Sequence, residues 1–137
     1  MKVVPRKKFM LFAGLEFAAI LVTLLAFVIF KIRPVASIVA ATPFILVGLY
    51  IIRELWRTHR PFQFASFYLA ILHVALTTVI GAQRVTFWDL PLDRIMLFDI
   101  PLAVLHKVAQ ACFWILIVAT YVDMYREQKM REIYPAK

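Results

Sequence analysis

The chain has 137 residues and a net charge of +8, and 64% of its residues are hydrophobic. One small water-soluble core cannot bury that much apolar side chain, so this composition excludes an ordinary soluble domain and indicates an integral membrane protein. The basic residues flank apolar segments rather than line one soluble face, which argues against nucleic acid as a partner and favours anionic lipid headgroups.

Four long apolar segments cover most of the chain. We predict transmembrane helices at about 9–30, 35–56, 62–83 and 100–123. Each segment reaches roughly the 17 to 25 residues that a helix needs to cross about 30 Å of hydrocarbon. The segments lack the alternating pattern of barrel strands, and a membrane span must satisfy its own backbone hydrogen bonds. The predicted fold is therefore all-α, a four-transmembrane-helix antiparallel bundle that forms a single membrane domain over 1–137.

The first segment follows a basic N-terminus, as the core of a secretory signal peptide does. It exceeds the roughly 7 to 15 residues of such a core, and no small-residue cleavage site closes it. We therefore expect this segment to be retained as a helix.

The distribution of lysine and arginine predicts the orientation of the bundle. Both termini and the loop at 53–60 share one side of the membrane and hold eleven of these residues, against four in the other loops, or five if Lys107 is counted. Because lysine and arginine accumulate in cytoplasmic loops, we expect cytoplasmic N- and C-termini and a basic cytoplasmic tail at 124–137. The tail mixes charges as a soluble helix does, so we expect it to extend the fourth helix to about Tyr134-Pro135. The expected location is the bacterial cytoplasmic membrane, since no organelle address is visible.

Glu16 is the one charged residue inside the first segment. A carboxylate at that depth is costly and should face protein or water. One expectation is structural: Glu16 pairs with Arg53 near the same end of the second helix, or it accepts a hydrogen bond from Tyr50. The alternative is proton-coupled transport. A four-span chain with one acidic residue in its first helix resembles the small multidrug-resistance transporters in architecture, and this resemblance implies that Glu16 exchanges protons.

The third segment carries small and polar residues on one face. They are Ser66, Ala70, His73, Thr77 and Gly81, spaced four, three, four and four residues apart. Residues with this spacing share one side of a helix, and small or hydroxyl-bearing residues favour close helix packing in lipid. We expect the stripe to face the interior, with Thr77 and, on the fourth segment, Gln110 as buried polar groups.

The connector at 84–99 mixes charged and aromatic residues. It is too apolar to extend freely into water and too charged to enter hydrocarbon, so we expect an interfacial amphipathic helix or a folded cap on the exoplasmic face. A long connector of this kind favours contacts with a membrane-protein partner or with a second copy of the chain. The candidate contact residues are Trp88, Asp89, Asp93 and Arg94. Asp99 should cap the fourth helix, with Pro101 in its first turn.

Two histidines form the candidate cofactor site. Histidines on adjacent antiparallel helices can ligate one iron from both sides, so His73 and His106 are candidate ligands of a b-type haem. Arg84 and Lys107 could then meet its propionates. The run Leu105-His106-Lys107 resembles the histidine-lysine element of membrane cytochromes of the b561 kind. The predicted depths of the two histidines differ by about four residues, roughly 6 Å along a helix axis, which counts against this hypothesis.

The familiar short catalytic signatures do not occur in the sequence. A small bundle with a mixed connector and a basic face fits a non-catalytic accessory, assembly or regulatory subunit of a membrane complex, or a homo-oligomer. Its length and span count resemble those of small bacterial membrane proteins induced by phosphate starvation. We therefore predict a non-catalytic role, with the haem protein and the proton-coupled transporter as alternatives.

Overall fold

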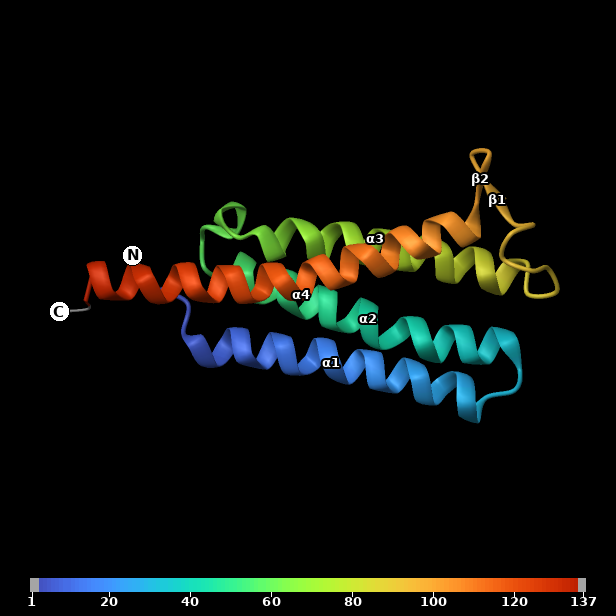
Figure 1. Cartoon of the computed structure of the whole chain (residues 1–137), viewed down its shortest axis with the longest axis horizontal. Helices are drawn as coiled ribbons and strands as arrows, with labels where there is room; N and C mark the ends of the chain where they lie inside the picture. The colour runs from blue at the N-terminus through green and yellow to red at the C-terminus, as the bar shows by residue number, and fades with distance from the viewer. Residues whose placement is uncertain (1–2, 136–137) are drawn as a thin grey trace.

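The structure is a computed structural model that describes residues 3–135 (Figure 1). Its elements in chain order are α1 (Arg6–Ile29), α2 (Arg33–Trp56), a 3₁₀ turn (Pro61–Gln63), α3 (Ala65–Thr86), the strands β1 (Met96–Leu97) and β2 (Ile100–Pro101), and α4 (Leu102–Ile133). The described part of the chain is thus almost wholly helical. Each of its four long helices is long and apolar enough to cross a membrane. This confirms the prediction of a helical chain with four candidate membrane spans.

One difference from the predicted helix bounds has a clear cause. The third helix starts at Ala65 instead of residue 62, because Pro61 opens a separate 3₁₀ turn. The fourth helix continues to Ile133, with Tyr134 as its C-cap, which confirms the prediction that the tail extends this helix. Residues 136 and 137 of that prediction lie outside the described residues.

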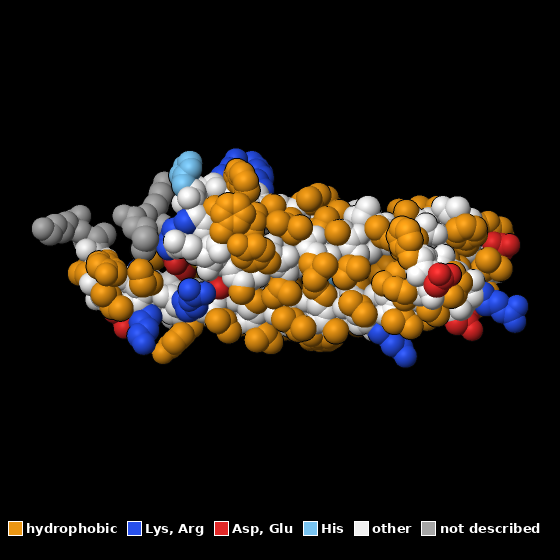
Figure 2. Space-filling model, turned by 90° about the horizontal axis from the view of Figure 1, so that it is seen from above, with side chains coloured by type: hydrophobic (Ala, Val, Ile, Leu, Met, Phe, Trp, Pro, Cys, Tyr) orange, Lys and Arg blue, Asp and Glu red, His pale blue; other side chains and the backbone are white. Residues whose placement is uncertain are grey.

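Consecutive helices run in opposite directions, so both termini lie at one end of the molecule and the α3 to α4 connector lies at the other (Figure 1). We call these the terminal end and the connector end. Each helix packs against its neighbours in sequence, and α1 also packs against α4. On the face drawn in Figure 2, most charged side chains lie toward the two ends and apolar side chains cover the middle. This is the distribution expected of helices that cross a bilayer.

Two apolar clusters hold the helices together. The larger cluster lies toward the terminal end and includes Phe9, Phe12, Ile51, Phe67 and Leu116. The smaller cluster lies toward the connector end and consists of Ile80, Ile95, Leu102 and Ala109. The outward faces also remain apolar, since Leu24, Val28, Leu46 and Val118 are 60 to 77% exposed. Soluble proteins rarely expose apolar surface on this scale, so these side chains are placed to contact lipid.

The connector contains a tight hairpin and no amphipathic helix. After α3 ends at Thr86, the chain turns repeatedly until β1 and β2 pair antiparallel. Phe98 and Asp99 occupy the tip with φ angles of 50° and 62°. Positive φ at both central residues is the conformation of a two-residue hairpin turn of type I′. Of the two forms anticipated for this segment, the structure therefore has the folded one.

The prediction that Asp99 caps the fourth helix is wrong. Asp99 lies in the hairpin tip, and Pro101 takes the N-cap position without a side-chain cap. A backbone group of the connector replaces the cap, because the Leu102 N–H donates to the Ile95 carbonyl at 2.7 Å. This bond satisfies one of the N–H groups that are left free at the start of any helix.

Candidate functional site

A cavity of about 360 Å³ lies among the four helices in the half of the molecule toward the connector end. Every long helix contributes to its wall. The polar side chains that line it are Thr23 of α1, Ser37 of α2, His73, Thr77 and Arg84 of α3, and His106 and Gln110 of α4. Within the described chain, the lining includes no Asp or Glu. Small-molecule sites fall in the range of roughly 300 to 1,000 Å³, so this cavity is large enough to be one.

The cavity opens sideways between α1 and α4. Its lining residues on α2 and α3 are buried or half-buried, whereas Leu24, Phe27, His106, Gln110 and Trp114 are exposed. Two of these exposed residues lie on α1 and three lie on α4, so the wall is incomplete on that side. The two helices also move apart toward the connector end (Figure 1). The surface around the opening is apolar. The opening therefore lies on the kind of surface that faces lipid in a membrane helix.

His73 forms part of the cavity floor and is 4% exposed. Its ring lies against Phe44 and Phe113, with centroid distances of 5.6 and 4.9 Å. The His73 Nε2 atom lies 3.2 Å from the Thr77 hydroxyl oxygen. All five residues of the α3 stripe are buried or half-buried, so the stripe faces the interior, as its spacing predicts.

Two hydroxyl groups on α1 and α2 differ in their bonding. The Thr23 hydroxyl donates to the Ala40 carbonyl at 3.1 Å, which joins α1 to α2 on the closed side of the cavity. The Ser37 hydroxyl is also buried, yet it has no hydrogen-bond partner in the described chain. An unpaired buried hydroxyl costs about 1 to 3 kcal/mol. A bound molecule that bonds to Ser37 would recover part of that free energy.

Arg84 brings positive charge to the connector end of the cavity. It is half-buried near the end of α3 and lines the cavity together with His106, and the exposed Arg33 at the start of α2 is close enough to repel its charge. The prediction that Gln110 is a buried polar group is wrong, because its position on α4 is exposed at the cavity opening. Gln110 lies one turn beyond His106, and their Nε2 atoms are 3.2 Å apart. We call Arg33 and Arg84 the arginine pair. The cavity therefore combines a positively charged rim with a largely apolar floor.

The predicted haem residues are only partly brought together. The cavity lining includes both histidines and Arg84, but not Lys107, which is exposed. The histidines lie at different depths, because His73 packs against Phe113, seven residues beyond His106 on α4. Side chains lean toward the N-terminus of their helix, so the offset is roughly 5 to 10 Å. Two axial ligands of one iron must face each other, and this offset does not favour that arrangement.

Glu16 lies outside the cavity lining and is fully buried in α1. Its partner is Thr120 of α4, whose Oγ1 atom lies 2.8 Å from Glu16 Oε1. The expected partners lie elsewhere: Arg53 is exposed, and the Tyr50 ring meets Phe12 edge to face. Sequence reasoning missed Thr120 because this pairing depends on the relative depth of α1 and α4 in the bundle. The pattern of residues within one helix does not determine that depth.

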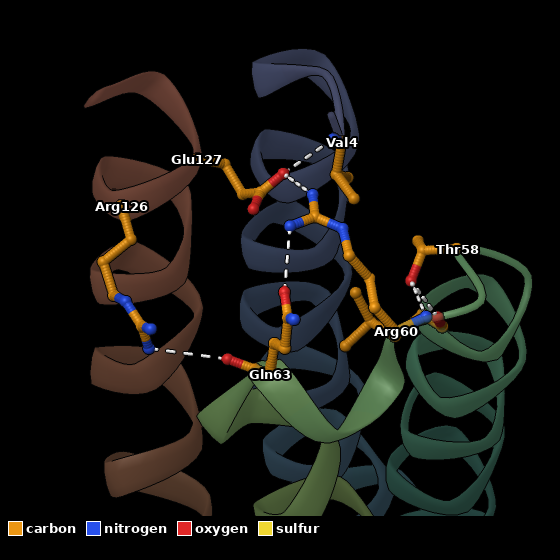
Figure 3. Close-up of polar contacts among 7 residues, drawn as sticks. Val4, Thr58, Arg60, Gln63, Arg126 and Glu127 are labelled. Atoms are coloured by element: carbon orange, nitrogen blue, oxygen red, sulfur yellow. Dashed lines mark hydrogen bonds and ion pairs between the residues drawn. The ribbon is translucent and has the colours of Figure 1, made fainter. Parts of the chain in front are cut away.

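Polar contacts cross-link the terminal end. Glu127 of α4 accepts hydrogen bonds from the backbone N–H of Val4 at 2.8 Å and from the Arg60 guanidinium at 2.6 Å (Figure 3). The Arg126 guanidinium donates to the Gln63 carbonyl at 3.4 Å. These contacts join the N-terminal segment and the α2 to α3 loop to α4. No local pattern in the sequence predicts these contacts.

Asp123 of α4 caps the start of α3. Its carboxylate accepts from the backbone N–H of Ala65 at 3.2 Å and from that of Ser66 at 2.8 Å, and the Ser66 hydroxyl donates at 2.6 Å. A carboxylate at a helix N-terminus satisfies free N–H groups and complements the helix dipole. A capping residue normally precedes its helix in sequence, so sequence reasoning placed Asp123 only at the exit of the fourth span.

The predicted contact residues of the connector remain accessible. Trp88, Asp89, Asp93 and Arg94 are all exposed. None of them lines the cavity among the described residues. They can therefore contact lipid or protein without altering the cavity wall directly.

No protein-family model, no curated protein and no solved structure matches this chain. Its function is therefore inferred from the geometry of the cavity and from the charges around it.

Proposed function

We propose that the chain is a non-catalytic membrane protein that holds a lipid-soluble molecule in the cavity between its helices. The observation that carries the proposal is the lateral opening, where exposed Leu24, Phe27 and Trp114 flank an inner wall whose polar groups include the buried Ser37 and His73. A molecule with an apolar part can enter there from lipid, and its polar part then meets hydroxyl and imidazole groups. The unpaired Ser37 hydroxyl in the same wall supports the proposal.

The proposal includes an antiparallel transmembrane bundle in the bacterial cytoplasmic membrane. The asymmetry of lysine and arginine, eleven against four, supports a cytoplasmic position for the terminal end. The cavity then lies in the exoplasmic half of the bilayer. The connector lies at the exoplasmic interface, where the exposed Phe87 and Trp88 suit the headgroup region.

The role is accessory or regulatory, with a membrane-protein partner or a second copy of the chain responding to the filled cavity. The exposed contact candidates are Trp88, Asp89, Asp93 and Arg94. Leu92, from the same connector, lines the cavity. A partner bound to the connector is therefore close to the ligand without touching it.

Two other functions receive less support. Proton-coupled transport through Glu16 needs this carboxyl group to line a path, whereas Glu16 is fully buried against Thr120 outside the cavity lining. Electron transfer through a haem needs His73 and His106 to face each other, whereas they are offset along the helices.

Extraction of the protein purified in a neutral detergent, followed by mass spectrometry, tests the proposal. We expect a stoichiometric lipid-soluble compound in the wild type and a much smaller amount in Ala41→Phe. Ala41 is half-buried and lines the cavity, so the ring of the new side chain would occupy part of the cavity. The matched control is Ala75→Phe, which adds the same ring to an exposed position of α3. Equal amounts in all three proteins, or none in any, would contradict the proposal. A Soret band in the wild-type sample would instead identify a haem protein.

A further inference from the structure

The connector end of the cavity carries positive charge that the described chain does not neutralise. Arg84 and His106 line the cavity, and Arg33, which is exposed and lies outside the lining, is close enough to repel the charge of Arg84. The ion pairs found in residues 3–135 all lie toward the terminal end, and neither member of the arginine pair takes part in one. Two neighbouring cations repel each other, so an anion bound between them would be stabilised.

The polarity of the wall changes along the cavity. Arg84 and His106 lie near the connector-end termini of α3 and α4. The floor is apolar, with the rings of Phe44 and Phe113 meeting edge to face at a centroid distance of 4.7 Å. Exposed Trp114 lies at the opening. This wall suits a molecule whose charged end lies toward the connector and whose apolar part leaves between α1 and α4.

Ser37 gives an independent indication of a ligand. Its hydroxyl lines the cavity, is 6% exposed and has no hydrogen-bond partner in the described chain. Ser37 lies one turn after Arg33 on α2, a rise of roughly 6 Å. A ligand that reaches both residues therefore carries an anionic group and a further oxygen about one helical turn deeper.

We infer that the cavity binds an anionic amphiphile, with carboxylate or phosphate oxygens at Arg84 and an alkyl chain that leaves between α1 and α4. This inference rests on the proposed function and names the chemical class of its ligand. Guanidinium groups bind carboxylate and phosphate through paired N–H donors. Basic pockets between transmembrane helices also accommodate anionic lipid headgroups.

Quenching of Trp114 fluorescence by brominated chains tests the inference. The chain has three tryptophans, so Trp56→Phe with Trp88→Phe leaves the one at the cavity opening as reporter. The protein in neutral detergent is titrated with a brominated fatty acid, a fatty alcohol and a lysophosphatidic acid of equal chain length. We expect saturable quenching by at least one anionic probe at concentrations where the alcohol does not quench.

Charge variants then locate the headgroup. Arg84→Gln should weaken binding of the anionic probe about tenfold, the loss expected for one charge-assisted hydrogen bond. Arg33→Gln is a second variant, at an exposed position, and should weaken binding of the same probe. The matched control is Arg94→Gln, which removes an exposed arginine outside the cavity lining and should leave binding unchanged.

The outcomes test separately whether the ligand is anionic and whether the cavity binds a ligand. Binding of the fatty acid alone identifies a carboxylate ligand, and binding of the lysophosphatidic acid alone identifies a phosphate ligand; either result, or both, supports the inference. Equal binding of acid and alcohol that is insensitive to Arg84→Gln overturns the anionic class and leaves the cavity as a binding site. If no probe quenches Trp114 saturably, the inference and the proposed function both fail.

Discussion

Thr120 Oγ1 lies 2.8 Å from Glu16 Oε1 and 3.0 Å from the Leu116 carbonyl oxygen. A hydroxyl group carries one hydrogen and cannot fully satisfy two acceptors. A proton on Glu16 resolves this conflict, because the carboxylic acid then donates to Thr120 while Thr120 donates to Leu116. Glu16 Oε2 has no hydrogen-bond partner in the described chain, which is costly for a buried carboxylate. We therefore expect Glu16 to be neutral in the folded protein.

Glu16→Gln should change the free energy of unfolding by less than about 1 kcal/mol, because the amide is a neutral group of the same shape that can both donate and accept. Thr120→Val should cost about 1 to 3 kcal/mol, since it leaves the buried Glu16 without its partner. Unfolding in mixed detergent, followed by circular dichroism, measures both values. A larger loss for Glu16→Gln than for Thr120→Val would show that Glu16 is charged.

Asp123→Ala should lower the free energy of unfolding by about 1 to 3 kcal/mol, because two backbone N–H groups of α3 lose their buried acceptor. Asp123→Asn should cost less, since its amide oxygen still accepts. The same unfolding assay applies. Asp93→Ala, which removes an exposed carboxylate of the connector, is the matched control and should leave stability unchanged. Equal stability of Asp123→Ala and the control would rule out the cap.

Glu127→Gln should loosen the N-terminal segment, because the charged acceptor of the Val4 N–H and of Arg60 is lost. We expect trypsin to cleave the basic run at 6–8 several times faster than in the wild type. The matched control is Glu132→Gln, at an exposed position of α4 outside these contacts. Cleavage at the wild-type rate in Glu127→Gln would contradict a role for this contact in holding the segment.

Gly48→Ala should destabilise the packing of α2 against α3 by about 1 to 3 kcal/mol, because a Cβ atom there would collide with the Val74 side chain. Adding Val74→Ala removes the colliding methyl group and should recover part of the loss. Gly14→Ala is the matched control, since nothing lies within 4 Å of its Cβ position. Alanine there should gain up to about 1 kcal/mol of helix propensity. Equal effects of Gly48→Ala and Gly14→Ala would contradict the close packing.

The four spans could be predicted from the length of the apolar segments, because a helix of about 20 apolar residues crosses the bilayer. The inward stripe of α3 could also be predicted, because spacing within one helix fixes which residues share a face. The hairpin in the connector could not. Its tip, Phe98-Asp99, lacks the Asn-Gly or Asp-Gly signal that normally marks a two-residue turn.

The candidate site could be predicted only in part. Sequence reasoning selected His73 and His106 as polar residues inside apolar segments, and both line the cavity. It did not find Ser37, nor the proximity of Arg33 and Arg84. Such contacts depend on the rotation and relative depth of neighbouring helices, which the periodicity of a single helix does not determine.

Photocrosslinking in the native membrane tests most directly whether an anionic amphiphile occupies the cavity. A photoreactive amino acid replaces Trp114 at the cavity opening or, as control, Trp56 toward the terminal end. The two positions are matched, being 57% and 59% exposed. We predict that position 114 captures one anionic amphiphile that position 56 does not. Capture of the same mixture of bulk lipids at both positions would contradict a binding site in this cavity.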